Sequence, residues 1–221
     1  MEALLQQFFD VEIMAQSLPV LLDGLWMTLL LCAVVIPMGL IGGLLTALAS
    51  LSRYRTLRWP TIGLIDLFRS IPPLVLLIFV FSGLPFAGVR LSPFAAVAIA
   101  FLLNNSAYYG EILRAGLLSV PKGQSEAARS TGLGAGQTLV HVTLPQAVRN
   151  VLPDLISNSV EVVKLTSLAS VVSLGELLHA ASLARSVTYN ASPVMLAALI
   201  YLILLWPVVR YLARFQRKLD I

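Results

Sequence analysis

The chain has 221 residues, of which 58% are hydrophobic and 12% are charged, and its mean hydropathy is +0.88. That length suits one domain, and the composition is too apolar for an ordinary soluble fold. The formal net charge is +4, but the positive residues are distributed as membrane anchoring requires, which argues against nucleic acid as a partner. We therefore expect a protein whose solvent is membrane lipid.

The predicted elements begin with an amphipathic segment over residues 1–19 at the outer membrane surface, with Leu4, Leu5, Phe8 and Phe9 on one side. Four uncharged stretches follow, at residues 24–52, 70–89, 91–110 and 186–209, each long enough to cross about 30 Å of hydrocarbon. A fifth stretch, 151–174, carries Asp154, Glu161 and Lys164, so it can span only if these charges face protein or water. The sequence predicts an all-α membrane protein with five transmembrane helices.

Basic residues indicate the orientation of these spans. They follow the first, third and fifth spans, as Arg53, Arg55 and Arg58, then Arg114, Lys122, Arg129 and Arg149, and then Arg210, Arg214, Arg217 and Lys218. Cytoplasmic connections carry the excess of Lys and Arg. The amino terminus is therefore predicted outside and the carboxyl terminus in the cytoplasm, with residues 20–215 as the membrane domain and 216–221 as a cytoplasmic tail.

The second span opens with two consecutive prolines, Pro72 and Pro73. Such a pair bends or restarts a helix, and a broken helix at membrane depth is tolerated only beside protein or a cavity. The sequence leaves open whether this break lines a pathway or is a plain kink.

The long polar connection at residues 119–150 contains several glycines between helix-forming residues, which predicts short helices joined by turns. A helix carrying Glu126, Ala127 and Ala128 would end at Gly132, a residue suited to a left-handed cap. A second short helix would run toward Leu144 and Pro145. We expect this ordered cytoplasmic loop to dock on a partner.

The residues of this loop carry a family resemblance. EAARSTGLGAGQTLVHVTLP, at 126–145, resembles the EAA loop of binding-protein-dependent ABC importers. DLFRSIPPLVLLIF (66–79), AYYGEILRAGLLSVPKGQSEAA (107–128) and VVKLTSLASVVSLGEL (162–177) resemble stretches of the permeases for polar amino acids. The resemblance covers residues 20–215.

This resemblance implies a type I ABC importer (MetI-like) permease fold in a bacterial inner membrane. The chain would form half of a translocation pathway for polar amino acids or their derivatives. Its partners would be two cytoplasmic ATPases, a second identical or homologous permease, and an extracytoplasmic binding protein docking around residues 85–91 and 177–189. The residues that couple to the ATPase would be Glu126, Ala127, Ala128, Gly132, Leu144 and Pro145. ATP and Mg²⁺ would bind the ATPase, with no cofactor or metal in this chain.

Three acid/base pairs are spaced i, i+3, so each pair shares a helix face. Asp66 with Arg69 and Glu111 with Arg114 are predicted to hold helix ends or a gate. Glu161 and Lys164 lie deeper, and an intramembrane charge indicates a functional site by default. Either they contact cargo, with an acceptor for its ammonium and a donor for its carboxylate, or they form a structural salt bridge.

The predicted substrate pathway consists of seven polar residues near membrane depth: Asn104, Asn105, Asn158, Glu161, Lys164, Thr166 and Ser167. Leu165 stands where related permeases commonly have a polar or acidic residue, and Asn158 stands where many have Glu. The resemblance therefore implies a specificity other than the usual one for cationic amino acids, or a heterodimer whose second permease supplies the charged contacts.

An enzyme is the less favoured class, because the sequence contains no HExxH, GxSxG or P-loop motif. ATP hydrolysis must then occur in a separate subunit. A secondary transporter or channel subunit is the alternative, since it would share the buried charges and broken helices. Five spans make only half a pathway, and the cytoplasmic loop would have no role in a carrier that works alone.

Overall fold

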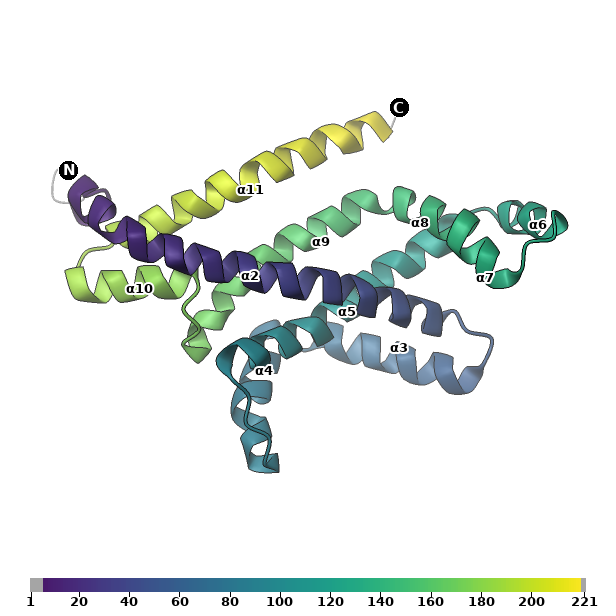
Figure 1. The fold of residues 1–221 in the computed structure, drawn as a ribbon, viewed down its shortest axis with the longest axis horizontal. Helices are drawn as coiled ribbons and strands as arrows, with labels where there is room; N and C mark the ends of the chain where they lie inside the picture. Colours follow the sequence, from purple (N-terminus) through teal and green to yellow (C-terminus); the bar gives the residue numbers. More distant parts are fainter. Residues whose placement is uncertain (1–5, 220–221) are drawn as a thin grey trace. The chain divides into compact units, whose positions relative to one another are not determined.

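The computed structural model describes residues 6–219, and all regular elements in this part of the chain are helical (Figure 1). Side chains are described through residue 214, so Leu4 and Leu5 and the side chains of Arg217 and Lys218 lie outside the described residues. The chain forms two compact units, one comprising residues up to 36, 73–101 and from 160 onward, and the other comprising residues 37–72 and 102–159.

The first unit contains the beginning of α2 (Val11–Ser50), α4 (Pro73–Ile78), η1 (Phe79–Gly83), η2 (Leu84–Ala87), the beginning of α5 (Pro93–Ser119), the end of α9 (Leu152–Leu165), η4 (Thr166–Val172), α10 (Leu177–Thr188) and α11 (Ser192–Leu219). Its core includes Leu21, Leu177, Ala181 and Ala197. Gly24 allows the close approach of α2 to α10, because a Cβ there would lie 2.8 Å from the Cβ of Ala180.

The second unit contains the rest of α2, α5 and α9, together with α3 (Arg55–Ser70), α6 (Lys122–Ser130), α7 (Ala135–Thr138), η3 (Leu139–Thr143) and α8 (Leu144–Asn150). Tyr109, Leu113, Ala147 and Leu155 are among the residues of its core. At Gly43 the backbones of α2 and α5 pack so closely that a Cβ would lie 2.9 Å from the backbone nitrogen of Gly110.

The first long helix differs from the prediction at its beginning. Residues 11–19 belong to α2, which continues without interruption to Ser50. A separate amphipathic helix ending near residue 18 was therefore a wrong expectation for this part of the segment. The Asp10 carboxylate caps the beginning of α2 by accepting the amides of Glu12 at 3.0 Å and Ile13 at 3.1 Å. From this cap the helix continues through Pro19 into the first span.

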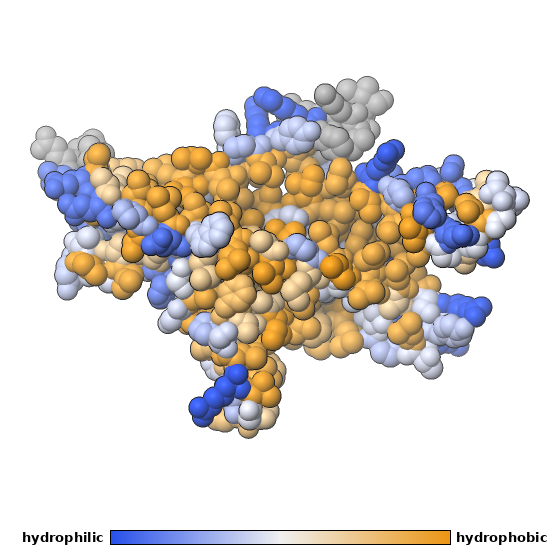
Figure 2. All heavy atoms as spheres, viewed as in Figure 1, coloured by the Kyte–Doolittle hydropathy of each residue, from blue (hydrophilic) through white to orange (hydrophobic). Residues whose placement is uncertain are grey.

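Three helical stretches in the described residues are long and apolar enough to cross a membrane: Gln6–Ser50, Leu152–Val172 and Ser192–Arg214. The broken pair Arg55–Ser70 and Pro73–Ala87 passes the same test as a fourth. Figure 2 shows that apolar residues cover most of the face in view, with hydrophilic residues in smaller groups. The helical membrane class is confirmed, whereas five spans and their orientation remain predictions.

The predicted break of the second span is present. Helix α3 ends at Ser70, and α4 begins at Pro73. Since neither Pro72 nor Pro73 has an amide hydrogen, the last carbonyls of α3 cannot complete the normal helical hydrogen bonds.

Candidate functional sites

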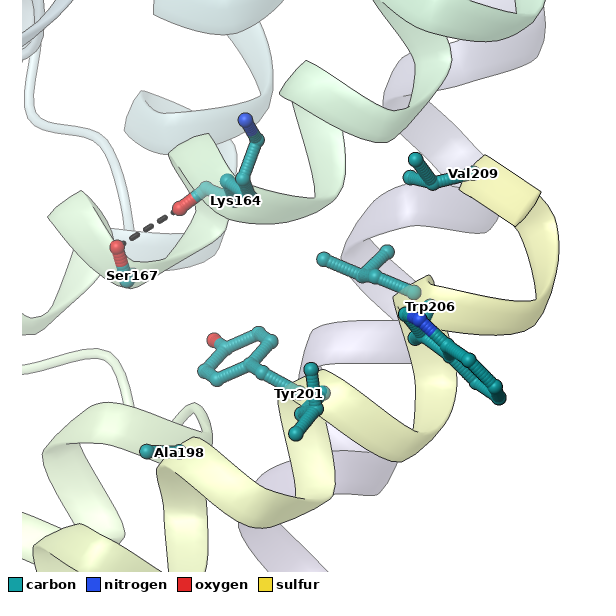
Figure 3. A pocket seen from close by; sticks show the side chains of 8 residues that line it. Lys164, Ser167, Ala198, Tyr201, Trp206 and Val209 are labelled. Carbon is teal, nitrogen blue, oxygen red and sulfur yellow. Dashed lines mark hydrogen bonds between the residues drawn. The ribbon is translucent and has the colours of Figure 1, made fainter. Parts of the chain in front are cut away.

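A groove in the first unit is lined by Lys164 and Ser167 on one side and by residues of α11 on the other, namely Ala198, Tyr201, Leu202, Leu205, Trp206 and Val209. Its volume is about 540 Å³. In Figure 3 the Tyr201 ring extends from α11 toward the side of Ser167, while the Trp206 ring points away from the other labelled side chains. The groove therefore combines an apolar wall with one cation and two hydroxyl groups.

Glu161 and Lys164 form the predicted ion pair in this unit. Their side chains are 60% and 51% exposed, respectively, although both belong to the apolar stretch Leu152–Val172. An exposed ion pair on a membrane span is costly against lipid. The exposure of the pair therefore favours water or another protein, rather than lipid, as the neighbour of this face of α9.

The two hydroxyl residues that follow Lys164 have different environments. Ser167 lines the groove and donates from Oγ to the carbonyl of Lys164, at 2.7 Å (Figure 3). Thr166 is fully buried and donates to the carbonyl of Val163. Thr166 is thus part of the packing in this structure, rather than an open surface of a pathway.

Sequence reasoning missed Glu176, which is fully buried. Its carboxylate caps α10 by accepting the backbone amides of Leu178 at 2.9 Å and His179 at 2.7 Å. The hydroxyl of Tyr201 also donates to it, at 3.3 Å. Burial raises the pKa of the Glu176 carboxyl, and the amides act in the opposite direction. The available signal was an acidic residue at the beginning of a helical segment, where a negative charge interacts favourably with the helix dipole.

The same network reaches α2 through Thr28. Its hydroxyl accepts the amide of Leu177 at 3.1 Å and donates to the carbonyl of Gly24 at 3.1 Å. Buried polar groups of this kind fix one arrangement of the surrounding helices, because each would be costly without its partner.

The three predicted pathway asparagines lie in the second unit. Asn104 is only 1% exposed and donates from Nδ2 to the carbonyl of Phe68, at 3.0 Å. Asn105 is buried as well, whereas Asn158 is half-buried. Buried atoms without a hydrogen-bond partner in the described part of the chain include Oδ1 of Asn104 and Nδ2 of Asn158. Asn104 thus has a structural contact that the sequence prediction did not include.

A polar pocket in the second unit brings together Asp66, Arg69, Glu111 and Arg114, with a volume of about 280 Å³. Glu111 and Arg114 form the predicted ion pair through two hydrogen bonds, one of them 3.0 Å long. The prediction of a second ion pair in this pocket was wrong, because Asp66 and Arg69 form none within the described residues. The Arg69 guanidinium instead lies over the ring of Tyr108, 5.6 Å from its centroid, where the two groups attract each other.

The predicted two-helix arrangement of the polar loop is present, as α6 followed by α7, η3 and α8. Helix α6 ends at Ser130, and Gly132 has a φ of 91°, so the left-handed cap is confirmed. The second helical part continues past Leu144 and Pro145 to Asn150. We call residues 122–150 the cytoplasmic hairpin, after the location predicted for them.

The predicted coupling residues divide into exposed and packed positions. Glu126, Ala127, Gly132 and Pro145 are exposed, Leu144 is half-buried, and Ala128 is buried. The small size of Ala128 therefore serves packing inside the hairpin, whereas Ala127 and the 55% exposed Val140 offer apolar surface outside it.

The hairpin is tied firmly to α5. Nδ2 of Asn150 donates to Oγ of Ser119, at 2.8 Å, which joins the two ends of the loop. At Gly116 an added Cβ would lie 2.8 Å from the carbonyl oxygen of Ala147. Because backbone meets backbone there, a displacement of the hairpin is transmitted to α5 with little slack.

Residues 36–221 match the family described as the binding-protein-dependent transport system inner membrane component. The chain belongs to this family. It is 35% identical over 216 residues to the probable amino-acid ABC transporter permease protein YckA of Bacillus subtilis, covering 97% of this chain and 94% of that protein. The L-cystine transport system permease protein TcyB of the same organism is 42% identical over 163 residues, which are 74% of this chain and 70% of that protein.

Solved structures support the same assignment. The crystal structure of an amino acid ABC transporter with histidines contains a chain that is 33% identical to this permease, with a TM-score of 0.83 and coverage of 93% of this chain and 96% of that one. The inward-facing MetNI methionine ABC transporter, at 22% identity and a TM-score of 0.75, shows the fold alone. The predicted family, the helical type I importer permease fold and the multi-pass membrane location are therefore confirmed.

Proposed function

We propose that this permease forms half of the translocation pathway of an ABC importer for polar amino acids or their derivatives. The relatives' amino-acid cargoes support this class of substrate. The chain would have five spans, with the amino terminus outside and the carboxyl terminus in the cytoplasm, and would pair with an identical or homologous permease. Which polar amino acid it moves is set by the groove and by its partner permease.

The observation that carries the proposal is the exposed Glu161–Lys164 pair on an apolar span. Lipid would penalise such a pair, whereas a water-filled pathway between two permeases would not. An amino acid zwitterion offers a carboxylate to Lys164 and an ammonium to Glu161, and both contacts are charge-assisted hydrogen bonds. Ser167, beside Lys164 in the groove, adds a hydroxyl to this surface.

The neighbouring apolar wall is relevant to the choice of cargo. Leu202, Leu205 and Trp206 line the groove with Lys164, so an uncharged or extended side chain would fit better than a cationic one. Leu165, at the position where related permeases are often polar or acidic, acts in the same direction. Glutamine-like amino acids and amino acid derivatives are therefore better candidates than arginine or lysine for a homodimer.

The exposed side of the cytoplasmic hairpin would couple this pathway to two cytoplasmic ATPases. Glu126, Ala127 and Val140 present a small polar and apolar surface suited to a groove on a partner. ATP and Mg²⁺ would bind in those partners. Closure of the ATPases would displace the hairpin and, through its packing on α5, alter the pathway.

An extracytoplasmic binding protein would deliver the cargo to the opposite side. The two segments predicted for its docking carry strongly exposed aromatic side chains, Phe86 at 95% and Tyr189 at 89%. Exposed aromatic residues are frequent anchors of protein interfaces.

The test is to co-express the permease with a candidate ATPase encoded near its gene and to measure co-purification and ATP hydrolysis in proteoliposomes. We expect loaded binding protein to stimulate hydrolysis. Gly132 has a positive φ, which strains any residue other than glycine. A Gly132→Asp variant should therefore distort the hairpin, no longer co-purify with the ATPase, and show no stimulation of hydrolysis. Gly136→Asp is the matched control, since an added Cβ meets nothing within 4 Å at either glycine and only Gly132 of the two has a positive φ. A permease that binds no ATPase but moves solute down an ion gradient would favour a secondary transporter.

A further inference from the structure

The prolines of the broken span remove two hydrogen-bond donors from the end of α3. In a continuous helix the carbonyl of Phe68 would accept the amide of residue 72, and that of Arg69 would accept the amide of residue 73. Both positions are proline, which has no amide hydrogen. A carbonyl without a partner is costly where water is scarce. This cost applies most to the carbonyl of Phe68, whose surroundings are part-buried, and less to that of the exposed Arg69.

Two side chains of α5 provide the missing donors. Nδ2 of Asn104 donates to the carbonyl of Phe68 at 3.0 Å, and the hydroxyl of Tyr108 donates to the carbonyl of Arg69 at a longer 3.5 Å. Asn104 and Tyr108 are four residues apart, so they lie on one face of α5. The hydrogen bonds of the broken helix are thus replaced one for one by a neighbouring helix.

The same face of α5 continues into the charged pocket. Tyr108 makes two contacts with Arg69. Its hydroxyl donates to the carbonyl of Arg69, and its ring lies under the Arg69 guanidinium. Glu111, three residues after Tyr108, lines that pocket together with Arg69. The contacts of Asn104 and Tyr108 therefore determine where Arg69 stands relative to Glu111 and its partner Arg114.

The opposite end of this part of α5 carries the cytoplasmic hairpin. Gly116 packs against the backbone of Ala147, and Ser119 accepts a hydrogen bond from Asn150. Asn104 and Gly116 are separated by 12 residues of uninterrupted helix, roughly 18 Å at 1.5 Å per residue. A continuous helix of this length behaves as a stiff rod, so both ends move together.

We propose that Asn104, assisted by Tyr108, is a positioning residue through which the hairpin and α5 hold and move the broken end of α3. For its transport readout this inference rests on the proposed function. Asn104 then acts by setting the position of Arg69 beside Glu111, and it is not itself a contact of the cargo. If the Asn104 amide is removed, ATP hydrolysis should continue while less cargo is moved for each ATP hydrolysed.

The experiment is a double-mutant cycle with Asn104→Leu, which removes the donor, and Pro72→Ala. The alanine supplies an amide at position 72 and releases Ile71, which is extended before the proline, so that α3 can lengthen until the new amide reaches the carbonyl of Phe68. Each variant is reconstituted with the ATPase and binding protein, and uptake of radiolabelled L-glutamine is measured per ATP hydrolysed. We expect Asn104→Leu to lower this ratio by roughly fivefold or more, given the cost of a buried carbonyl without a donor. Asn104→Leu/Pro72→Ala should recover most of it.

Pro60→Ala is the matched control, because it also restores an amide within α3 but far along the helix from Phe68. It should not rescue Asn104→Leu. Thermal unfolding of the purified permease provides a second readout that needs no cargo: Asn104→Leu should lower the midpoint, and Pro72→Ala should restore it. If the thermal midpoint is rescued but no variant shows ATP-driven uptake, the positioning role of Asn104 is supported and the proposed import function is wrong. If Asn104→Leu is silent in both readouts, or Pro60→Ala rescues as well as Pro72→Ala, the proposal is wrong.

Discussion

The hydroxyl of Tyr201 lies 3.3 Å from Oε2 of Glu176, so a groove-lining aromatic residue is anchored to a fully buried carboxylate. This contact joins α11 to the beginning of α10, and Thr28 extends it to α2. One side of the groove is therefore held by polar contacts that lie behind it. Its shape depends on residues that do not themselves line it.

Tyr201→Phe removes the hydroxyl and leaves the ring in place. We expect a loss of about 1–3 kcal/mol in the free energy of unfolding, because a buried carboxylate loses a donor. The concentration of cargo that half-saturates uptake should also rise, since the ring is no longer fixed. Tyr211→Phe is the control, because Tyr211 lies on the same helix but is 68% exposed. Equal stability of the two variants would contradict this account.

Glu176→Gln tests the titration of the buried carboxyl. Because burial raises the pKa of Glu176 above its ordinary value of 4.5, the folded protein holds this proton more tightly than the unfolded chain. The associated stability is present below pH 4.5 and is lost as pH rises through the higher folded pKa. Wild type should therefore lose more thermal stability than Glu176→Gln as pH rises from about 4.5. Parallel pH profiles of the two proteins would show that Glu176 does not titrate in this way.

Gly43→Ala tests the close packing of α2 on α5. An added Cβ would lie 2.5 Å from the Cβ of Tyr109 and 2.9 Å from the backbone nitrogen of Gly110. The backbone has to shift, and overpacking of this kind costs about 1–3 kcal/mol. Gly63→Ala, in the open part of α3 where nothing lies within 4 Å, should be neutral or stabilise the helix by up to about 1 kcal/mol. Chemical denaturation of the purified variants measures both effects, and a neutral Gly43→Ala would refute the predicted clash.

Exchanging the charges of Glu161 and Lys164 distinguishes cargo binding from a structural salt bridge. The double variant Glu161→Lys/Lys164→Glu keeps an ion pair at the same spacing, so its thermal stability should remain near that of wild type. Uptake should fall by roughly tenfold or more, because the charges then oppose those of a zwitterion held in the native orientation. Normal uptake by the exchanged variant would assign the pair to structure alone.

Much of the architecture could be predicted from local patterns. The proline pair correctly marked the end of α3, and Gly132 correctly marked the turn of the cytoplasmic hairpin, since both residue types restrict the backbone directly. The length of α2 was not predictable from the charge-free stretch alone, because the helix begins at the Asp10 cap and continues through Pro19 and Asp23 before that stretch starts.

The candidate sites were less predictable, because their contacts depend on neighbouring helices. Spacing alone favoured an Asp66–Arg69 ion pair, but the Arg69 guanidinium lies over the ring of Tyr108 on α5 instead. Asn104 looked like a pathway residue because it is polar at membrane depth, and its partner, the carbonyl of Phe68, became identifiable only when α3 and α5 were placed side by side. Glu176 was missed because its surroundings combine α10 and α11 with α2, which is distant in sequence.

Import driven by ATP hydrolysis is tested most directly by uptake into proteoliposomes containing the permease, its ATPase and loaded binding protein, with and without ATP inside the cytoplasmic compartment. The account predicts accumulation of a polar amino acid that requires ATP and the binding protein, persists when ion gradients are collapsed, and is abolished in Gly132→Asp. Accumulation that needs an ion gradient but neither ATP nor the binding protein would contradict it.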